Sequence, residues 1–306
     1  MTSSQRFDDR ASRVGRVLRL VSSLAVVAAC DTSPSGPRSA TASGSAAVMV
    51  GAGDIARCST EWDEATALLL DDIPGTVYTT GDNAYSDGTA ANFAECYEPS
   101  WGRHKARTRP SPGNHDYHTT DAAGYFDYFG ALAGEDRTGY YSYDLGSWHV
   151  ISLNSEIDMD VGSPQEQWLR ADLAANPTAC TVAYWHEPRF NSGDNHGSSS
   201  GPVPLWEALY EHHVEIVLNG HDHLYERFAP QTPDGTADPD HGIRQFTVGT
   251  GGGPLYDFGT PLPNSEARNN VAHGVLKLVL SPGSYQWEFV PVAGEAFMDS
   301  GVGTCH

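Results

Sequence analysis

Five apolar segments of this 306-residue chain each lead into a loop that carries polar side chains, and this repeated arrangement constrains the fold most. Four of the segments cover residues 47–52, 76–80, 181–185 and 214–218, and such short apolar runs between turn residues predict buried strands. The polar residues that follow the five segments are Asp54, Asp82 with Tyr85, Asn114 with His115, His186, and His221 with His223. Open α/β sheets bind ligands beyond the carboxyl ends of their strands, so we expect these side chains to meet at one edge.

Predicted helices separate these strands. A capping-box pattern at residues 60–63 opens a helix through Leu70, and a second pattern at residues 163–166 opens a helix to about Ala175. Residues 204–213 form a third predicted helix. The alternation of strands and helices predicts right-handed crossovers and a largely parallel sheet with the helices outside it.

Pairs of strands joined by short turns dominate the later part of the chain. Residues 140–144 and 148–153 flank Gly146, and residues 274–280 and 284–290 flank a Pro-Gly turn. These hairpins predict a second sheet, mixed or antiparallel, that packs on the first.

The polar residues after the strands offer the donor atoms of a metal site. Carboxylate, amide, imidazole and phenol groups suit iron, manganese or zinc better than soft copper(I). A single catalytic ion usually takes about three protein ligands and leaves one position open. Seven candidate ligands therefore indicate two ions, about 3.5–4 Å apart, that share a bridging carboxylate.

The order of these motifs resembles that of the calcineurin-like metallophosphoesterases. The blocks that carry the resemblance are Gly53–Ala56, Gly81–Tyr85, Gly113–Asp116, Ala183–His186 and Gly220–His223. Tyr85, which follows Asp82 by three residues, and the sequence at 225–227 are similar to the purple acid phosphatase branch. The resemblance implies an α/β fold, a four-layer α/β/β/α sandwich with mixed sheets.

The resemblance also implies how the metals are held. Metal one is expected on Asp54, Asp82, Tyr85 and His223. Metal two is expected on Asp82, Asn114, His186 and His221, so that Asp82 bridges the two ions. A tyrosinate ligand favours Fe(III), with Fe, Zn or Mn as its neighbour.

The activity that the resemblance implies is hydrolysis of a small phosphoric monoester by a metal-bound hydroxide. His115 would contact the phosphate and assist the leaving group. His196, in a loop at 187–203 rich in Gly, Ser and Asn, is expected as a second substrate contact. The alternatives are a phosphodiesterase or nucleotide pyrophosphohydrolase on the same scaffold, and a surface binding protein that retains metals without catalysis.

The charge of the chain excludes some partners. The formal net charge is −21, which argues against duplex nucleic acid or an anionic membrane surface as the main partner. A phosphate substrate remains compatible with this charge, because bound metal ions supply local positive charge.

The N-terminus predicts export. Five arginines precede a ten-residue apolar run, Leu20 to Ala29, that is too short to span a bilayer. Small residues then lead to Cys30, which resembles a bacterial lipobox and predicts a lipid anchor there as the only contact with a membrane. We therefore divide the chain into a signal peptide (1–30), a flexible linker (31–45) and a catalytic domain (46–306). The protein is expected to be a cell-surface lipoprotein or secreted.

Four further cysteines predict two disulfides, since an even number is typical of exported chains. We favour Cys58 with Cys96, because each follows a predicted strand that ends at the same sheet edge. Cys180 with Cys305 then follows by exclusion. A zinc site made of cysteines is disfavoured because the chain has no CxxC motif.

Overall fold

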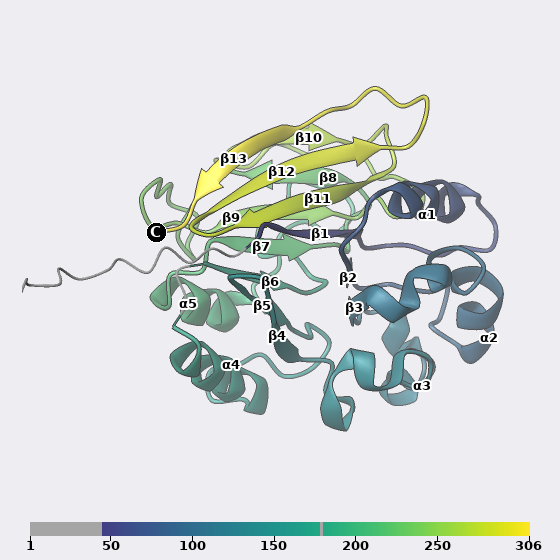
Figure 1. Ribbon diagram of the computed structural model, residues 1–306, viewed down its shortest axis with the longest axis horizontal. Coiled ribbons are helices and arrows are strands. Elements are labelled where there is room, and N and C mark those ends of the chain that lie inside the picture. The colour runs from purple at the N-terminus through teal and green to yellow at the C-terminus, as the bar shows by residue number, and fades with distance from the viewer. Residues whose placement is uncertain (1–44, 178–179) are drawn as a thin grey trace, which may run out of the picture. The chain divides into compact units, whose positions relative to one another are not determined.

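The computed structural model describes residues 45–177 and 180–306 (Figure 1). The predicted signal peptide 1–30 with Cys30, and all but the last residue of the predicted linker 31–45, lie outside the described residues. Within the described ranges, no helix combines the length and the apolar character that a membrane crossing requires.

The first sheet has six strands and mixed direction. Its order is β13-β12-β11-β1-β2-β3. The bounds are β1 Ala47–Ala52, β2 Thr76–Thr80, β3 Thr108–Ser111, β11 Gly274–Ser281, β12 Ser284–Pro291 and β13 Ser300–Thr304. Strands β1, β2 and β3 are parallel, whereas β11, β12 and β13 form an antiparallel meander that joins at β1.

The second sheet has seven strands in the order β10-β8-β9-β7-β6-β5-β4. The bounds are β4 Tyr141–Leu145, β5 Trp148–Ser152, β6 Thr181–Tyr184, β7 Ile216–Asn219, β8 Tyr225–Phe228, β9 Arg244–Val248 and β10 Ser265–Asn269. The centre, β5-β6-β7-β9, is parallel, and antiparallel strands complete both edges. Both sheets are therefore mixed, as the family resemblance implies. The predicted hairpins do not form a sheet of their own, because β4–β5 extends the second sheet at β6 and β11–β12 extends the first at β1.

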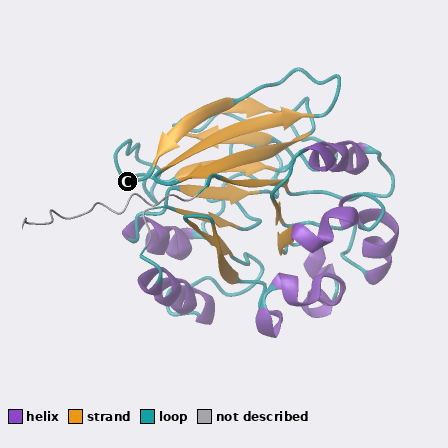
Figure 2. Cartoon of the chain, in the orientation of Figure 1, coloured by secondary structure: helices purple, strands orange, loops and turns teal. Residues whose placement is uncertain are grey.

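Helices lie outside the strands (Figure 2). The α-helices are α1 Trp62–Asp72, α2 Ala90–Asn92, α3 Ala123–Phe129, α4 Pro164–Ala175 and α5 Val203–Glu211. A π-helical turn, η1 Phe93–Tyr97, and a 3₁₀ helix, η2 Trp101–Arg107, follow α2. Further 3₁₀ turns are η3 Asp116–His118, η4 Thr120–Ala122, η5 Gly130–Ala133 and η6 Glu135–Arg137.

Two apolar cores hold the layers together. The larger core contains side chains from both sheets, such as Val50 and Leu278 of the first and Val182 and Phe246 of the second. The smaller core packs Leu169 and other α4 and α5 side chains on the outer face of the second sheet. The α/β/β/α arrangement is the predicted fold, and it explains why the central strands are apolar on both faces.

Some predicted local features are confirmed and one is wrong. The Ser163 side chain accepts a hydrogen bond from the Glu166 amide at the start of α4, as the capping pattern predicts. At α1 the N-cap is Glu61 and no side chain caps the helix. Thr60 instead donates its hydroxyl to the Gly252 carbonyl, so a long-range contact replaces the predicted capping box.

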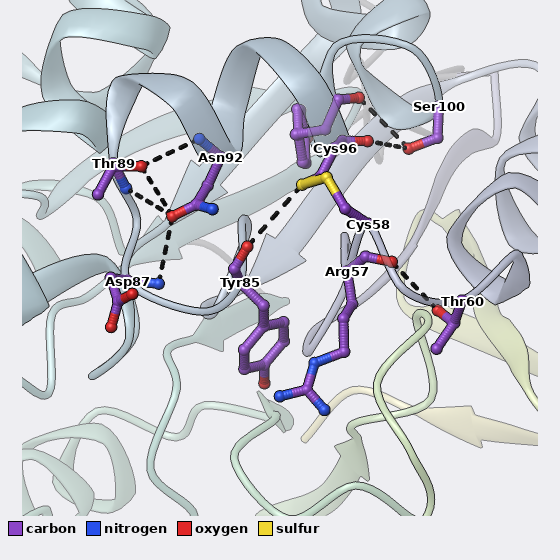
Figure 3. The surroundings of a disulfide bond; sticks show 10 residues. Arg57, Cys58, Thr60, Tyr85, Asp87, Thr89, Asn92, Cys96 and Ser100 are labelled. Atoms are coloured by element: carbon purple, nitrogen blue, oxygen red, sulfur yellow. Dashed lines mark hydrogen bonds between the residues drawn. A yellow bond between two sulfur atoms is a disulfide. The ribbon is translucent and has the colours of Figure 1, made fainter.

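Both predicted disulfides are present. Cys58 pairs with Cys96, which lies in η1 rather than in a loop directly after a strand (Figure 3). Cys180 pairs with Cys305 and joins the beginning of β6 in the second sheet to the end of β13 in the first. Two disulfides are typical of proteins in oxidising compartments, outside the cell or in the secretory pathway.

Candidate metal centre

The predicted ligands gather where the parallel strands of the two sheets end. Asp54, Asp82 and Asn114 follow β1, β2 and β3, and His186 and His221 follow β6 and β7. Five of the seven side chains are almost completely buried, and Asn114 and His221 are partly exposed. The topology therefore brings together side chains that lie up to 169 positions apart in the sequence, as expected for ligands beyond carboxyl ends.

One group of donors surrounds the Tyr85 hydroxyl. Its oxygen lies 2.9 Å from Asp54 Oδ1, 3.0 Å from Asp82 Oδ2 and 2.9 Å from His223 Nε2. His223 Nε2 is also 3.3 Å from Asp54 Oδ1. These are the four side chains expected around metal one.

A second group surrounds the Asn114 side-chain oxygen. Asn114 Oδ1 lies 3.0 Å from His186 Nε2 and 3.1 Å from His221 Nδ1, and these two nitrogens are 3.1 Å apart. Asp82 Oδ1 is 3.5 Å from His186 Nε2. Asp82 thus faces the first group with one oxygen and the second with the other, which is the geometry of a bridging carboxylate.

Backbone carbonyls orient two of the candidate ligand histidines. His186 Nδ1 lies 2.8 Å from the Thr80 carbonyl, and His223 Nδ1 lies 2.8 Å from the Pro254 carbonyl. Each ring therefore carries a hydrogen on its outer nitrogen and turns the lone pair of Nε2 inward. In this tautomer both Nε2 atoms face two carboxylates and an amide oxygen, and this set of nitrogen and oxygen donors fits metal ions.

Burial and charge shift several pKa values in the cluster. Burial alone would raise the pKa of Asp82, but the neighbouring His186 and His115 lower it below its usual range. Burial and the nearby His186 lower the pKa of His221 to about 3, so this imidazole is neutral and can act as a ligand. Burial, followed by the two carboxylates, raises the pKa of Tyr85.

The backbone turns sharply at three of the predicted ligands themselves. Asp54, Asp82 and His221 have φ angles of 59°, 50° and 72°. Side chains seldom adopt this left-handed region, and such strain concentrates at functional sites. Of the motif glycines Gly53, Gly81, Gly113 and Gly220, only Gly81 has a positive φ, and a Cβ there would also come within 2.5 Å of His186 Nδ1.

A fully buried carboxylate locks two of the site loops together. Asp116 Oδ2 accepts hydrogen bonds from the Asn83 amide (3.2 Å), the Asn83 side chain (2.9 Å) and the Gly113 amide (3.0 Å). Burial, then the Asp82 charge, raises the pKa of Asp116 to about 7. Asp116 thus positions the residues beside Asp82 and Asn114, a role that the sequence did not reveal.

The two histidines predicted to contact substrate lie at the rim. His115 packs its ring against Tyr85 at 4.6 Å between centroids, with Nδ1 on the Ser86 carbonyl and Nε2 3.9 Å from Asp82 Oδ2. His196 is exposed, and its ring centroid lies 4.1 Å from that of His221. The structure therefore brings all nine predicted site residues together.

Two further rim residues escaped the sequence analysis. Tyr256 stacks on His223, with ring centroids 4.1 Å apart and an interplanar angle of 10°. The Arg57 guanidinium lies 5.3 Å from the Tyr85 ring centroid, and Figure 3 shows the two side chains extending in the same direction. Among the described residues, the Arg57 side chain forms no ion pair. The sequence gives one sign of this role, which is that Arg57 directly follows the first motif, Gly53–Ala56.

The loop at 187–202 is tied to the centre by Asp222, which lies between His221 and His223. Asp222 Oδ2 accepts hydrogen bonds from the Asn191 side chain and from the Gly197 amide, the latter at 3.4 Å. The Gly197 amide follows His196 directly. This carboxylate therefore sets how close the loop brings His196 to His221.

Comparison with known proteins identifies the family. A family model described as calcineurin-like phosphoesterase matches residues 48–225. The chain therefore belongs to the calcineurin-like phosphoesterases, and it is related to the purple acid phosphatases within them. Members of this family carry a dimetal centre, which agrees with the two donor groups.

Two relatives from Arabidopsis thaliana show this relationship. Purple acid phosphatase 22 is 37% identical over 150 residues, which cover 46% of this chain and 34% of the relative. Purple acid phosphatase 18 is 29% identical over 255 residues, which cover 75% of this chain and 56% of the relative. The match thus spans about a third to about half the length of these relatives.

A solved structure shares the fold. The purple acid phosphatase PPD1 from yellow lupin (Lupinus luteus) seeds superposes with a TM-score of 0.68 at 19% identity. The match covers 85% of this chain and 54% of the lupin chain. It confirms the predicted sandwich.

Proposed function

We propose that this protein hydrolyses phosphoric monoesters with two metal ions held in the described cluster. The observation that carries the proposal is that seven donor side chains form two groups that share Asp82. Metal one would be held by Asp54, Asp82, Tyr85 and His223, and metal two by Asp82, Asn114, His186 and His221. When bound, the ions supply Lewis-acid polarisation of the ester and of a water molecule.

The rim side chains would bind the substrate and manage the proton. His115 keeps the hydrogen of Nδ1 on the Ser86 carbonyl at 2.5 Å, which leaves Nε2 to carry an exchangeable proton toward the leaving oxygen. His196, whose ring centroid lies 4.1 Å from that of His221, would donate a hydrogen bond to a phosphate oxygen.

Arg57 would add a charge-assisted contact to the substrate phosphate. Its guanidinium is partly exposed and lies beside Tyr85, and a planar fork of N–H donors matches phosphate oxygens. In a chain with a net charge of −21, an arginine without an ion pair in the described structure favours an anionic ligand.

For metal one we propose Fe(III), with Fe, Zn or Mn as metal two. Tyr85 supports this proposal, because its hydroxyl lies within 3.0 Å of three other donors and phenolate is a hard ligand. A ferric tyrosinate absorbs visible light, and Tyr85→Phe should abolish this band while the other six donors still bind metal. A fully metallated, active and colourless wild type would rule out the ferric ion.

We also propose that the protein is exported, as a lipoprotein anchored through Cys30 or as a secreted form. The two disulfides support an oxidising compartment. Labelling of expressing cells with a radioactive fatty acid, with Cys30→Ser as the control, distinguishes the anchored from the secreted form.

The monoesterase proposal is tested by turnover of aryl phosphate monoesters and diesters by metal-loaded protein. We expect a preference for monoesters, and His115→Ala should lower kcat by roughly a hundredfold while the metal content stays unchanged. His212→Ala, an exposed histidine near the end of α5, serves as the matched control. A strong diester preference would instead favour a phosphodiesterase, and inactivity of metal-loaded wild type would favour a binding protein.

A further inference from the structure

Three exposed histidines converge at the sheet edge opposite the metal centre. His213 precedes β7 and His241 precedes β9, whereas the proposed ligands follow the other ends of the parallel strands. His306 follows β13 of the first sheet. The three residues therefore belong to separate segments and play no part in the site described above.

The three rings face one another. Ring centroids are 6.1 Å apart for His213 and His241, 6.0 Å for His213 and His306, and 5.7 Å for His241 and His306. One ring nitrogen from each residue lies within 4.8 Å of those of the other two. All three side chains are exposed, so an ion can reach them from solvent.

Independent contacts fix the backbone under each ring. The His213 amide donates to the Tyr210 carbonyl at 3.1 Å, and this residue has a φ of 57°. The His241 amide donates to Asp238 Oδ1 at 3.1 Å. His306 directly follows Cys305, which is held by its disulfide and by a hydrogen bond from its amide to the Gly283 carbonyl. The convergence is thus a product of the folded chain.

We propose that His213, His241 and His306 form a binding site for a divalent transition-metal ion of the zinc class. Three neutral imidazoles suit such ions, and water can complete a tetrahedral shell. Zinc–nitrogen bonds of about 2.0–2.1 Å place ligand nitrogens roughly 3.4 Å apart, a spacing that small rotations of exposed rings can reach.

An ion at this site would tie the two sheets together. His306 extends from β13 in the first sheet, whereas His213 and His241 flank strands of the second. The disulfide between Cys180 and Cys305 joins the same two sheets one residue away. The metal would therefore act as a second cross-link, and its binding would stabilise the folded chain by mass action.

The test titrates Zn²⁺ into full-length protein whose dinuclear centre is already loaded. We expect wild type to bind one zinc ion per chain more than His241→Ala or His213→Ala, and to show a zinc-dependent rise in Tm of several degrees that both variants lose. His212→Ala, an exposed neighbour outside the cluster, should behave as wild type. Phosphatase turnover of the loaded enzyme should be equal in all four proteins, which separates this site from the proposed catalytic centre.

Two results would overturn the proposal. Equal zinc stoichiometry and equal Tm response in wild type and both cluster variants would show that the three rings bind no ion. If His212→Ala lost the extra zinc ion together with the two cluster variants, the zinc would not be bound by the three rings of the cluster alone. A native circular dichroism spectrum and retained turnover show that a variant has folded, and a variant that loses both is excluded from the comparison.

Discussion

Arg57 offers a way to change substrate binding without removing a metal donor. Its guanidinium packs on the Tyr85 ring at the rim, outside both donor groups. A hydrogen bond to a charged group contributes about 1.5–3 kcal/mol, so Arg57→Gln should lower kcat/KM for aryl phosphates roughly ten- to hundredfold, mainly through KM. Steady-state kinetics with metal analysis checks this prediction.

The control for Arg57→Gln is Arg137→Gln, which removes an exposed arginine that pairs with Asp127 on the surface. Arg57→Lys should recover only part of the activity, because an ammonium group lacks the planar fork that matches phosphate. An unchanged KM in Arg57→Gln would show that the guanidinium does not touch the substrate.

At single positions, the sequence predicted the proposed ligands better than the residues around them. Asp54, Asp82 and His221 each follow a glycine at the end of a predicted strand. This repeated pattern can be seen in the sequence alone. Asp116 and Arg57 were missed because their roles depend on contacts between loops. A single arginine or aspartate has no periodic pattern, so only the fold reveals what it faces.

At the scale of elements, the hairpin β4–β5 is joined to α4 by a buried histidine. His149 on β5 contacts Asp172 of α4 at 2.7 Å and Asp144 of β4 at 3.1 Å. Burial lowers the pKa of His149, but these two carboxylates outweigh burial and raise it above its ordinary value of 6.5. The charged form is therefore the one that the folded state favours.

This raised pKa predicts a pH-dependent contribution to stability. The contribution is complete below the unfolded pKa of His149 and is lost as the pH rises through the higher folded pKa. His149→Gln should cost about 1.5–3 kcal/mol of unfolding free energy at pH 5 and clearly less at pH 8.5. Urea unfolding at both pH values measures the difference. His118→Gln, which removes an exposed pair with Asp87, should show little change at either pH.

The loop at 187–202 depends on one buried amide. The Asn191 side-chain N–H groups donate to Asp222 and to the Gly197 carbonyl. Its backbone amide donates to Ser198 Oγ at 3.1 Å. Asn191→Ala should free the loop that carries His196, raising KM severalfold with a smaller effect on kcat and accelerating amide hydrogen exchange across the loop. Asn270→Ala lies outside this loop and is the control. Unchanged exchange rates would show that other contacts hold the loop.

Among the elements, the central strands, the β4–β5 hairpin and the α4 helix could be predicted, whereas the edge strand β13 could not. β1 and β7 are apolar on both faces because layers cover them on both sides, and this gives a plain sequence signal. β13 has the sequence SGVGT, which is poor in strand-forming residues, and it pairs along β12 because the Cys180–Cys305 disulfide and backbone bonds hold it there. Such tertiary contacts leave no local pattern.

On the scale of the whole molecule, the proposed chemistry combines an acidic surface with an anionic substrate. The net charge of −21 repels phosphate esters at long range. The proposed metal ions and Arg57 would supply the compensating positive charge within the site. Salt screens the repulsion between the surface charge and the substrate, with a Debye length of about 10 Å at 0.1 M. The attraction by the proposed metal ions and Arg57 acts within that distance.

The two disulfides span the molecule differently, and this difference predicts separate consequences. Cys180–Cys305 closes a sequence separation of 125 residues and Cys58–Cys96 one of 38 residues. The chain-entropy estimate assigns them about 5 and about 4 kcal/mol, so either double Cys→Ser variant should lower Tm by roughly 10 °C. Differential scanning calorimetry measures both values.

The kinetic effects should diverge, because one disulfide adjoins the site. Cys58 follows Arg57 directly, and Cys96 Sγ lies 3.9 Å from the Tyr85 carbonyl oxygen (Figure 3). Removing this disulfide frees the segment that holds Arg57 over Tyr85. At an assay temperature well below the Tm of both variants, the Cys58→Ser/Cys96→Ser variant should therefore have a higher KM than wild type. The Cys180→Ser/Cys305→Ser variant should keep the wild-type KM at that temperature, since it lies at the opposite sheet edge. Equal KM values in the two variants would mean that the position of Arg57 does not depend on the disulfide beside it.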